Sequence, residues 1–185
     1  AISGVVAVAD LPLAAIAHHA LEAAADTESL RRAERWVRAA GDRAAAMMAH
    51  EEAARHYDLA LEVSARAGLA TPQKLHDLLV KLVEARQRAG DLRGAREAGR
   101  RAVTVAKETS DPMLIATAVL ALAGCLPGFG AIVSDPEVVG ELEQALALLP
   151  STATWLRAQV MARLSEELVY SPGRGAKAFG QQAIE

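Results

Sequence analysis

A helical pattern that returns at a nearly fixed interval is the strongest constraint on how this chain can fold. Ala60, Ala102 and Ala145 stand at the same point of that pattern, each followed by Leu or Val, at intervals of 42 and 43 residues. A period of about 20 to 50 residues is typical of stacked helical repeats, in which each helix pair leaves an apolar face that the next pair covers. The period therefore predicts an all-α, right-handed α-solenoid of antiparallel helix hairpins.

The composition favours the same fold class. Hydrophobic residues make up 52% of the 185 residues, but aromatic residues make up only 3%. The core must therefore be built from Ala, Leu and Val, which suits helices that approach one another closely and argues against a β-sandwich. The chain is long enough to bury a substantial core, and one domain of ordinary size is expected.

Helix-forming stretches follow one another from residue 12 onward. Pro12 and Pro112 suit a first helical turn, where the missing N–H is not needed, while Gly68 and Gly90 follow the ends of helical patterns. Gly41 lies inside a stretch, where it costs about 1 kcal/mol relative to alanine, and it predicts that a neighbouring helix passes too close for a Cβ. The apolar spacing predicts helices over about 12–25, 27–48, 50–67, 73–89, 92–108, 112–124, 136–149 and 152–170, then an unfinished ninth helix.

The two ends of the chain are expected to be truncated. The chain opens at Ala1 rather than at a methionine, and it closes at Glu185 inside a helical pattern without a Gly or Pro stop. We assign residues 1–9 to a remnant or tail and residues 10–185 to the solenoid, as an excerpt from a longer protein.

The net charge and the cysteine content limit which partners and which cellular compartment are expected for this chain. The formal charge of −3 and the isoelectric point near 6.0 give no long-range attraction to nucleic acid. Asp10 and Pro12 interrupt the apolar start of the chain, so neither a membrane span nor a signal peptide is predicted. The single Cys125 excludes an internal disulfide, fits a cytoplasmic location and is predicted to be a buried structural thiol.

The motifs that would indicate catalysis are incomplete. His50 begins a stretch like the H-E-x-x-H zinc signature, but Ala54 stands where the second histidine is required. The glycine-rich stretch at 124–130 lacks the Gly-Lys-Ser/Thr ending of a phosphate loop, so residues 124–134 are predicted to be a loop between helices that could also contact a partner. We predict that this chain is not an enzyme and holds no cofactor, no metal and no catalytic residue.

Charged residues at helical spacing are predicted to lie on solvated faces. His18 with Glu22, and Glu52 with His56, are interpreted as surface pairs rather than as halves of a metal site. Two basic stripes are interpreted as solvated, with the alternative that they hold an acidic peptide or a nucleotide phosphate from a neighbouring domain: Arg93, Arg96, Arg100 and Lys107, and Arg31, Arg35 and Arg38.

Three parts of the chain resemble the tetratricopeptide repeat. In the first, Ala53, Tyr57, Ala60 and Leu61 have the spacing of the second helix of that motif, and Gly41 falls where its first helix carries glycine. The next unit matches through Gly90, Ala95 and Ala102 but has Val83 in place of the glycine and Gly99 in place of an aromatic residue, and a third match is Ala145, Leu146 and Pro150. The interval of 42 to 43 residues exceeds the usual length of about 34, which implies a degenerate, extended version of the repeat.

Residues 12–180 also resemble the helical region that follows the ATPase domain in large actinobacterial regulators, such as the maltose regulator and the large ATP-binding LuxR-type regulators. The resemblance lies in the stretches His18–Leu21, Arg38–Ala44, Glu51–Tyr57 and Leu164–Ser171. It implies a sensor or autoinhibitory arm in transcription regulation, with the ATPase and DNA-binding parts outside this chain.

The function expected from these observations is protein interaction without catalysis. The partner would be a protein, a peptide or another domain of the same chain, and a homo-oligomer is an open alternative. A small-effector-binding domain and a free-standing adaptor scaffold are the alternative functions. By position in the repeat, the residues expected to line the partner-binding groove are Arg35, Arg38, Asp42, Asp77, Glu84, Gln87 and Arg88.

Overall fold

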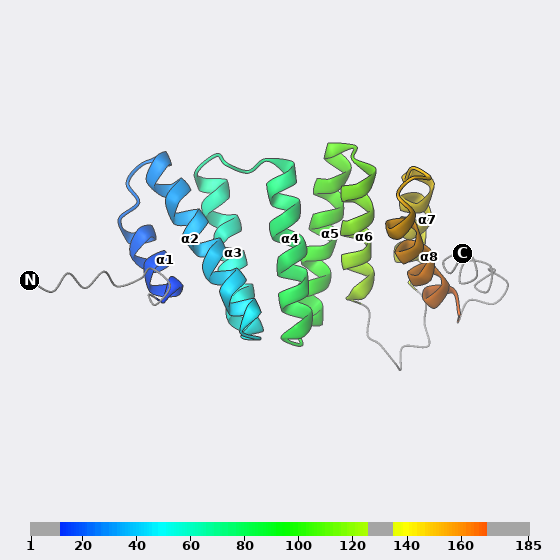
Figure 1. Cartoon of the computed structure of the whole chain (residues 1–185), viewed down its shortest axis with the longest axis horizontal. Helices are drawn as coiled ribbons and strands as arrows, with labels where there is room; N and C mark the ends of the chain where they lie inside the picture. Colours follow the sequence, from blue (N-terminus) through cyan, green and yellow to red (C-terminus); the bar gives the residue numbers. More distant parts are fainter. Residues whose placement is uncertain (1–11, 126–134, 170–185) are drawn as a thin grey trace, which may run out of the picture. The chain divides into compact units, whose positions relative to one another are not determined.

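The computed structural model describes residues 12–125 and 135–169, and the only regular secondary structure within them is α-helix. The all-α prediction is therefore confirmed for the described residues. The predicted tail at 1–9, most of the predicted loop at 124–134 and the predicted ninth helix lie outside them. The helices are α1 (Leu13–Glu22), α2 (Thr27–Ala46), α3 (His50–Arg66), α4 (Pro72–Arg88), α5 (Leu92–Thr109), α6 (Pro112–Gly124), α7 (Pro136–Leu148) and α8 (Thr154–Leu168) (Figure 1).

The helix boundaries follow the local chemistry of the sequence. Asp111 and Asp135 cap α6 and α7, where each carboxylate accepts a hydrogen bond from a backbone N–H two residues on, at 2.8 and 2.9 Å. Gly68 and Gly90 adopt positive φ values of 63° and 83° just after α3 and α4, a conformation that glycine reaches without steric cost. The predicted helices agree with the structure within a few residues. The largest difference is α1, which ends at Glu22 rather than near residue 25.

The chain divides into two compact units, residues 1–71 and 72–185. In the first unit, α2 packs against both α1 and α3. The core of the first unit consists mainly of small side chains, among them the fully buried Ala33, Val37, Ala53 and Ala60. Small side chains let the helix axes approach closely, as the low aromatic content predicts.

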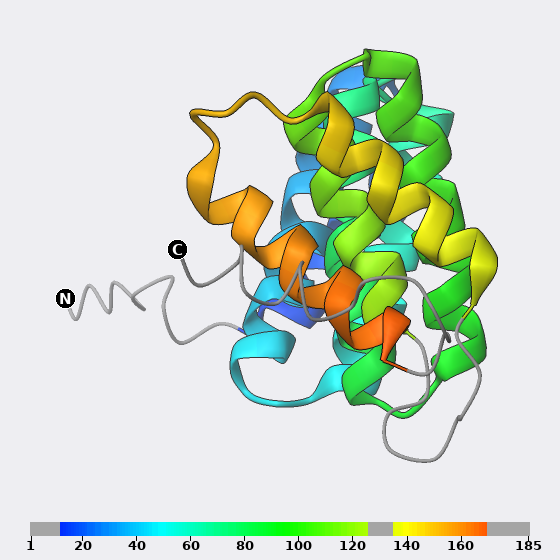
Figure 2. The ribbon, with the colours of Figure 1, turned by 90° about the vertical axis from the view of Figure 1, so that its right-hand side faces the viewer.

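In the second unit, α6 packs against four other helices: α4, α5, α7 and α8. Its sequence from Pro112 to Gly124 contains no charged residue, and Ala116, Val119 and Ala123 have no exposed surface. A helix that is apolar on every side requires cover on every side. Figure 1 shows α4 and α5 beside α6, and Figure 2 shows α7 and α8 in front of the same helix.

Two helical glycines lie so close to a neighbouring helix that a Cβ would have little room. A Cβ on Gly41 would lie 2.8 Å from Cε1 of Tyr57, so the prediction that a neighbouring helix passes too close for a side chain is confirmed. A Cβ on Gly99 would lie 3.0 Å from the backbone Cα of Leu122 on α6, a contact that the sequence analysis does not anticipate. Backbone yields less readily than the end of a side chain, so Gly99 is the tighter constraint.

None of the described helices is long and apolar enough to cross a membrane.

The close approach at Gly99 predicts opposite effects for two glycine substitutions. Gly99→Ala should lower the free energy of unfolding by about 1 to 3 kcal/mol, because the added methyl group meets α6 backbone. Gly140→Ala on α7 should raise it by about 0.5 to 1 kcal/mol, because nothing lies within 4 Å of the new Cβ and alanine favours the helix. Urea unfolding followed by circular dichroism measures both. Equal effects at the two sites would contradict the assigned packing of α5 against α6.

Candidate functional site

The residues predicted to bind a partner lie on two helices in two units. Arg35, Arg38 and Asp42 lie on α2 in the first unit, and the remaining four, on α4 in the second unit, are Asp77, Glu84, Gln87 and Arg88. The contacts described for each group are with residues of its own unit.

The α4 group is engaged mainly with its own unit. Glu84 and Arg88 form an ion pair on the exposed surface, with 2.6 Å between Oε1 and Nη2. Oδ1 of Asp77 lies 3.2 Å from Nδ1 of His76. The Gln87 amide contacts α6 and its C-cap residue, because Nε2 lies 3.2 Å from Sγ of Cys125 and 3.4 Å from the backbone oxygen of Ala121.

The α2 group is less completely engaged. The Tyr57 hydroxyl on α3 donates a hydrogen bond of 2.9 Å to Oδ1 of Asp42. Arg35 is exposed and Arg38 is half-buried. Neither guanidinium forms a hydrogen bond or an ion pair with any residue that the structure describes. These two cations are therefore available to an anion from outside their unit.

His76 forms polar contacts that were not predicted from the sequence. Only 4% of the residue is exposed, and its Nε2 lies 3.1 Å from the carbonyl oxygen of Leu114 and 3.0 Å from Oγ1 of Thr117. Because a carbonyl oxygen only accepts hydrogen bonds, Nε2 is the donor in the contact with Leu114, and this contact joins α4 to α6. A signal was present in the sequence, since His76 stands among the inward-facing leucines of its helix.

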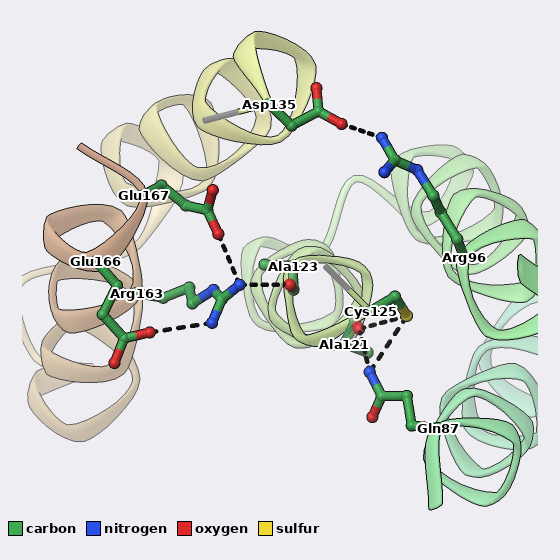
Figure 3. Close-up of polar contacts among 9 residues, drawn as sticks. All are labelled: Gln87, Arg96, Ala121, Ala123, Cys125, Asp135, Arg163, Glu166 and Glu167. Atoms are coloured by element: carbon green, nitrogen blue, oxygen red, sulfur yellow. Dashed lines mark hydrogen bonds and ion pairs between the residues drawn. The ribbon is translucent and has the colours of Figure 1, made fainter. Parts of the chain in front are cut away.

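A polar cluster surrounds the carboxyl end of α6 (Figure 3). On one side, the Cys125 thiol donates to the carbonyl oxygen of Ala121 at 3.3 Å and accepts from Gln87. On the other side, Nη2 of Arg163 from α8 donates to the carbonyl oxygen of Ala123 at 2.6 Å. Carbonyl groups at a helix end lack partners within the helix and carry a partial negative charge, which the Arg163 cation complements.

The chemistry of this cluster is structural. Burial raises the pKa of the Cys125 thiol, which keeps it neutral and poorly nucleophilic, and the prediction of a buried thiol is confirmed. Arg163 is itself held by Glu167 at 2.6 Å and Glu166 at 3.0 Å, and Glu167 is 8% exposed. The cluster therefore ties α4 and α8 to the end of α6.

A second set of polar contacts, the α5–α7 ladder, joins the basic stripe of α5 to acidic residues at the start of α7. The Arg96 guanidinium donates a hydrogen bond to the Asp135 carboxylate. Two more pairs follow along the helices, Arg100 with Glu137 at 2.8 Å and Lys107 with Glu141 at 2.7 Å. Three of the four residues of this stripe therefore pair with acids from a helix about 34 to 39 residues away in the sequence, while the Arg100 and Lys107 side chains stay about half exposed.

The ladder shifts the pKa values of its carboxylates. Burial acts to raise the pKa of Asp135, but the hydrogen bonds from Arg96 and from the α7 backbone outweigh it, and the pKa lies below the ordinary value of 3.8. The hydrogen bond from Arg100 likewise holds the pKa of Glu137 below the ordinary value of 4.5. Both carboxylates are therefore ionised over a wide pH range.

Metal-binding clusters are missing from the part of the chain that the structure describes: nowhere in it do three or more His, Cys, Asp or Glu side chains group suitably. His18 and His19 both lie beside Glu22 on the exposed surface of α1, at 3.3 and 3.4 Å. Glu52 pairs with His56 on α3 at 3.7 Å. The His18–Glu22 contact agrees with its interpretation as a surface pair, whereas the His56 side chain is only 15% exposed.

No family model, curated protein or solved structure matches this chain.

The lowered pKa values of the ladder predict acid sensitivity. A carboxylate whose pKa is lower in the folded than in the unfolded chain stabilises the fold fully above its unfolded pKa, and this contribution is lost as the pH falls through the folded value. Stability should therefore fall below about pH 5, and the fall should be smaller in Arg96→Gln/Arg100→Gln, where Asp135 and Glu137 lose the arginine hydrogen bonds that lower their pKa values. Urea unfolding at a series of pH values measures the slope.

Arg93→Gln/Arg101→Gln is the matched control for that experiment, since it removes two exposed cations of the same helix that pair with no acid among the described residues. It should keep the pH slope of the unsubstituted chain. A slope that is the same in all three proteins would show that the ladder does not contribute.

The cluster at the end of α6 predicts a cost for removing its cation. Arg163→Met should lower the free energy of unfolding by about 2 to 3 kcal/mol, because the buried Glu167 loses its counter-ion and a helix-end carbonyl loses its donor. Adding Glu167→Gln should restore part of that loss. Glu166→Gln, at an exposed partner of the same arginine, should change stability by less than about 1 kcal/mol. Equal losses for Arg163→Met and Glu166→Gln would contradict the assigned role.

Proposed function

We propose that this chain is a protein-interaction module, built as an α-solenoid of antiparallel, tetratricopeptide-like helix hairpins, and that it forms the repeat arm of a multidomain ATP-dependent transcription regulator in the cytoplasm. The observation that carries the proposal is the order of helix contacts in the second unit. Each helix from α4 to α8 packs against its neighbour in the sequence, and α6 also packs against α4 and α8, two places away.

This order of contacts is the one that stacking of hairpins produces. In a stack, the first helix of a hairpin contacts its own partner and also the first helices of the hairpins before and after it. The contacts of α6 with α4 and α8 fit that description, and α5 and α7 then form the other row. The ladder between α5 and α7 supports the second row by joining side chains of adjacent hairpins.

A row of helices held in this way presents rigid faces, which suits recognition of another protein. The outward residues of α4 include Asp77, Glu84 and Arg88, which recur at helical spacing and present two negative charges and one positive charge. Charges of fixed position give specificity and orientation to an interface rather than large affinity. The sequence resemblance to regulator arms supports a partner that is another domain of the same polypeptide.

The coding sequence upstream of Ala1 tests the assignment to a regulator. The proposal expects a P-loop ATPase domain there, with its Gly-Lys-Ser/Thr motif between a strand and a helix. An upstream region without such a domain would contradict the regulator assignment and leave a free-standing adaptor as the better description.

A charge exchange on α4 tests the interaction itself. Glu84→Lys/Arg88→Glu retains an ion pair four residues apart, so stability should change by less than about 0.5 kcal/mol, while the charges presented to a partner are inverted. Binding of the chain to the remaining domains of its parent protein, added in trans, should weaken about tenfold because opposed charges become like charges. Isothermal titration calorimetry gives the affinity, and thermal unfolding gives the stability.

The control for this exchange is Glu62→Arg/Arg66→Glu on α3, an equivalent swap between two exposed residues four apart. It should leave the affinity unchanged. An unchanged affinity for the α4 variant as well would exclude the outer face of α4 from the interface.

A further inference from the structure

The outward side of α2 carries more positive charge than its own unit neutralises. The helix has five arginines, Arg31, Arg32, Arg35, Arg38 and Arg43, of which Arg38 is half-buried and the others are exposed. We call these five residues the α2 arginine face. Of the three acids on the helix, Glu34 is only 2% exposed and belongs to the buried side.

The two outward acids of α2 are already engaged. Oε2 of Glu28 lies 3.5 Å from Nη1 of Arg31, so the first arginine of the face is only weakly paired. Asp42 accepts the hydrogen bond from the Tyr57 hydroxyl. Arg35, Arg38 and Arg43 form no hydrogen bond or ion pair with any residue between 12 and 125 or between 135 and 169.

The excess positive charge on α2 differs from the positive charge on α5 in how it is paired. Three of the basic residues of α5 are paired with acids of α7, in contacts that join two helices of the fold. The arginines of α2 make no such contacts between helices. A row of cations that joins no helices, and in which only Arg31 has a weak acidic contact among the described residues, repels itself, and an added anion relieves that repulsion.

The geometry of α2 fixes the spacing of these charges. Arg31, Arg35 and Arg38 stand at positions i, i+4 and i+7, which brings them to one side of the helix over a rise of about 10 Å. The helix is held at both ends of this row: Asp26 and Ser29 form a capping box at its start, and Gly41 lies against the ring of Tyr57. The guanidinium groups are therefore presented by a rigid support.

We propose that the α2 arginine face binds an acidic helical segment of a protein partner, whose carboxylates recur at the same i, i+4, i+7 spacing. This inference rests on the proposed interaction function and names the chemistry of the partner. The planar guanidinium group donates two parallel hydrogen bonds to a carboxylate, so three arginines at helical spacing match three glutamates on a facing helix.

A protein acid fits this face better than a nucleic acid. Glu28 and Asp42 lie on the same outward side, and the whole chain has a formal charge of −3. A continuous polyphosphate would meet both acids and the net negative charge, whereas a carboxylate row can be placed opposite the arginines alone.

Trp36 offers a local reporter for the test. It is half-buried and stands four residues after Arg32, on the flank of the arginine face. The chain has only two tryptophans, and the other, Trp155, is exposed on α8 in the second unit. In the Trp155→Phe variant, tryptophan emission therefore comes from Trp36 alone.

The experiment titrates the Trp155→Phe chain with a synthetic alanine-rich helical peptide that carries glutamates at i, i+4 and i+7. The expected result is a saturable change in Trp36 emission that weakens as salt is raised, and no saturation with the same peptide carrying glutamines. Arg35→Ala/Arg38→Ala should weaken binding at least about fivefold through the loss of two charge-assisted contacts. The control Arg93→Ala/Arg101→Ala removes the same charge from α5 and should bind as the parent variant does.

Three results would overturn the proposal: equal binding of the glutamate and glutamine peptides, parental affinity in the α2 double variant, or tighter binding of single-stranded oligothymidylate than of the glutamate peptide at the same salt. Circular dichroism of the α2 double variant confirms that it is folded, because both of its substitutions lie outside the core.

The α4 charge exchange separates this failure from failure of the proposed function. If the glutamate peptide does not bind but the parent domains still bind with sensitivity to the α4 exchange, only the acidic partner is excluded. If the parent domains do not bind at all, the interaction function is wrong.

Discussion

The packing of α6 on all sides is the constraint on which the second unit depends. A helix without a charged side chain gains stability only when neighbours cover its whole circumference, and α4, α5, α7 and α8 provide that cover. Such cover requires small residues at the contacts. Gly99 leaves no room for a Cβ against the backbone of Leu122, so α5 lies as close to α6 as two helices of this composition allow. The position of α6 then determines which residues of the surrounding helices face inward.

Polar contacts complete this packing where apolar side chains cannot. His76 and Gln87 of α4 reach backbone or side-chain groups of α6, and Arg163 of α8 binds its last turn. Buried polar groups stabilise a fold only if their hydrogen bonds are satisfied, so these contacts specify one arrangement of the helices rather than add much net stability. The α5–α7 ladder acts in a similar way between the surface rows, at lower burial and with greater sensitivity to acid.

The use of charge separates structure from recognition in this chain. Three of the five cations of α5 are used within the fold, and Glu84 and Arg88 of α4 pair with each other on the surface. Arg35, Arg38 and Arg43 of α2 fit neither description, and α2 is the helix on which the proposed acidic partner binds. A basic stripe in the sequence can therefore either form ion pairs within the fold or remain for a partner. Which of the two applies depends on whether an acid lies opposite the stripe in the folded chain.

The helices themselves could be predicted because their signals are local. Apolar spacing, the caps at Asp111 and Asp135, and the glycines at 68 and 90 act within a few residues, and the observed helix ends follow them closely. Gly41 was also predictable, since a glycine inside a helix needs a neighbour to explain it. The partner-binding residues could be placed on their helices for the same reason, but the orientation of Gln87 toward Cys125 could not, because its partners lie 34 and 38 residues away.

By itself, then, the amino-acid order determined that the described chain is helical, where each helix begins and ends, and which side of most helices is apolar. Only the tertiary structure decided which cations meet acids, which glycine faces a backbone, and that a histidine on α4 binds α6. The physical reason is the range of the interactions along the sequence. Helix formation depends on contacts four residues apart, whereas ion pairs and close packing between helices depend on distances in space that no short stretch of sequence records.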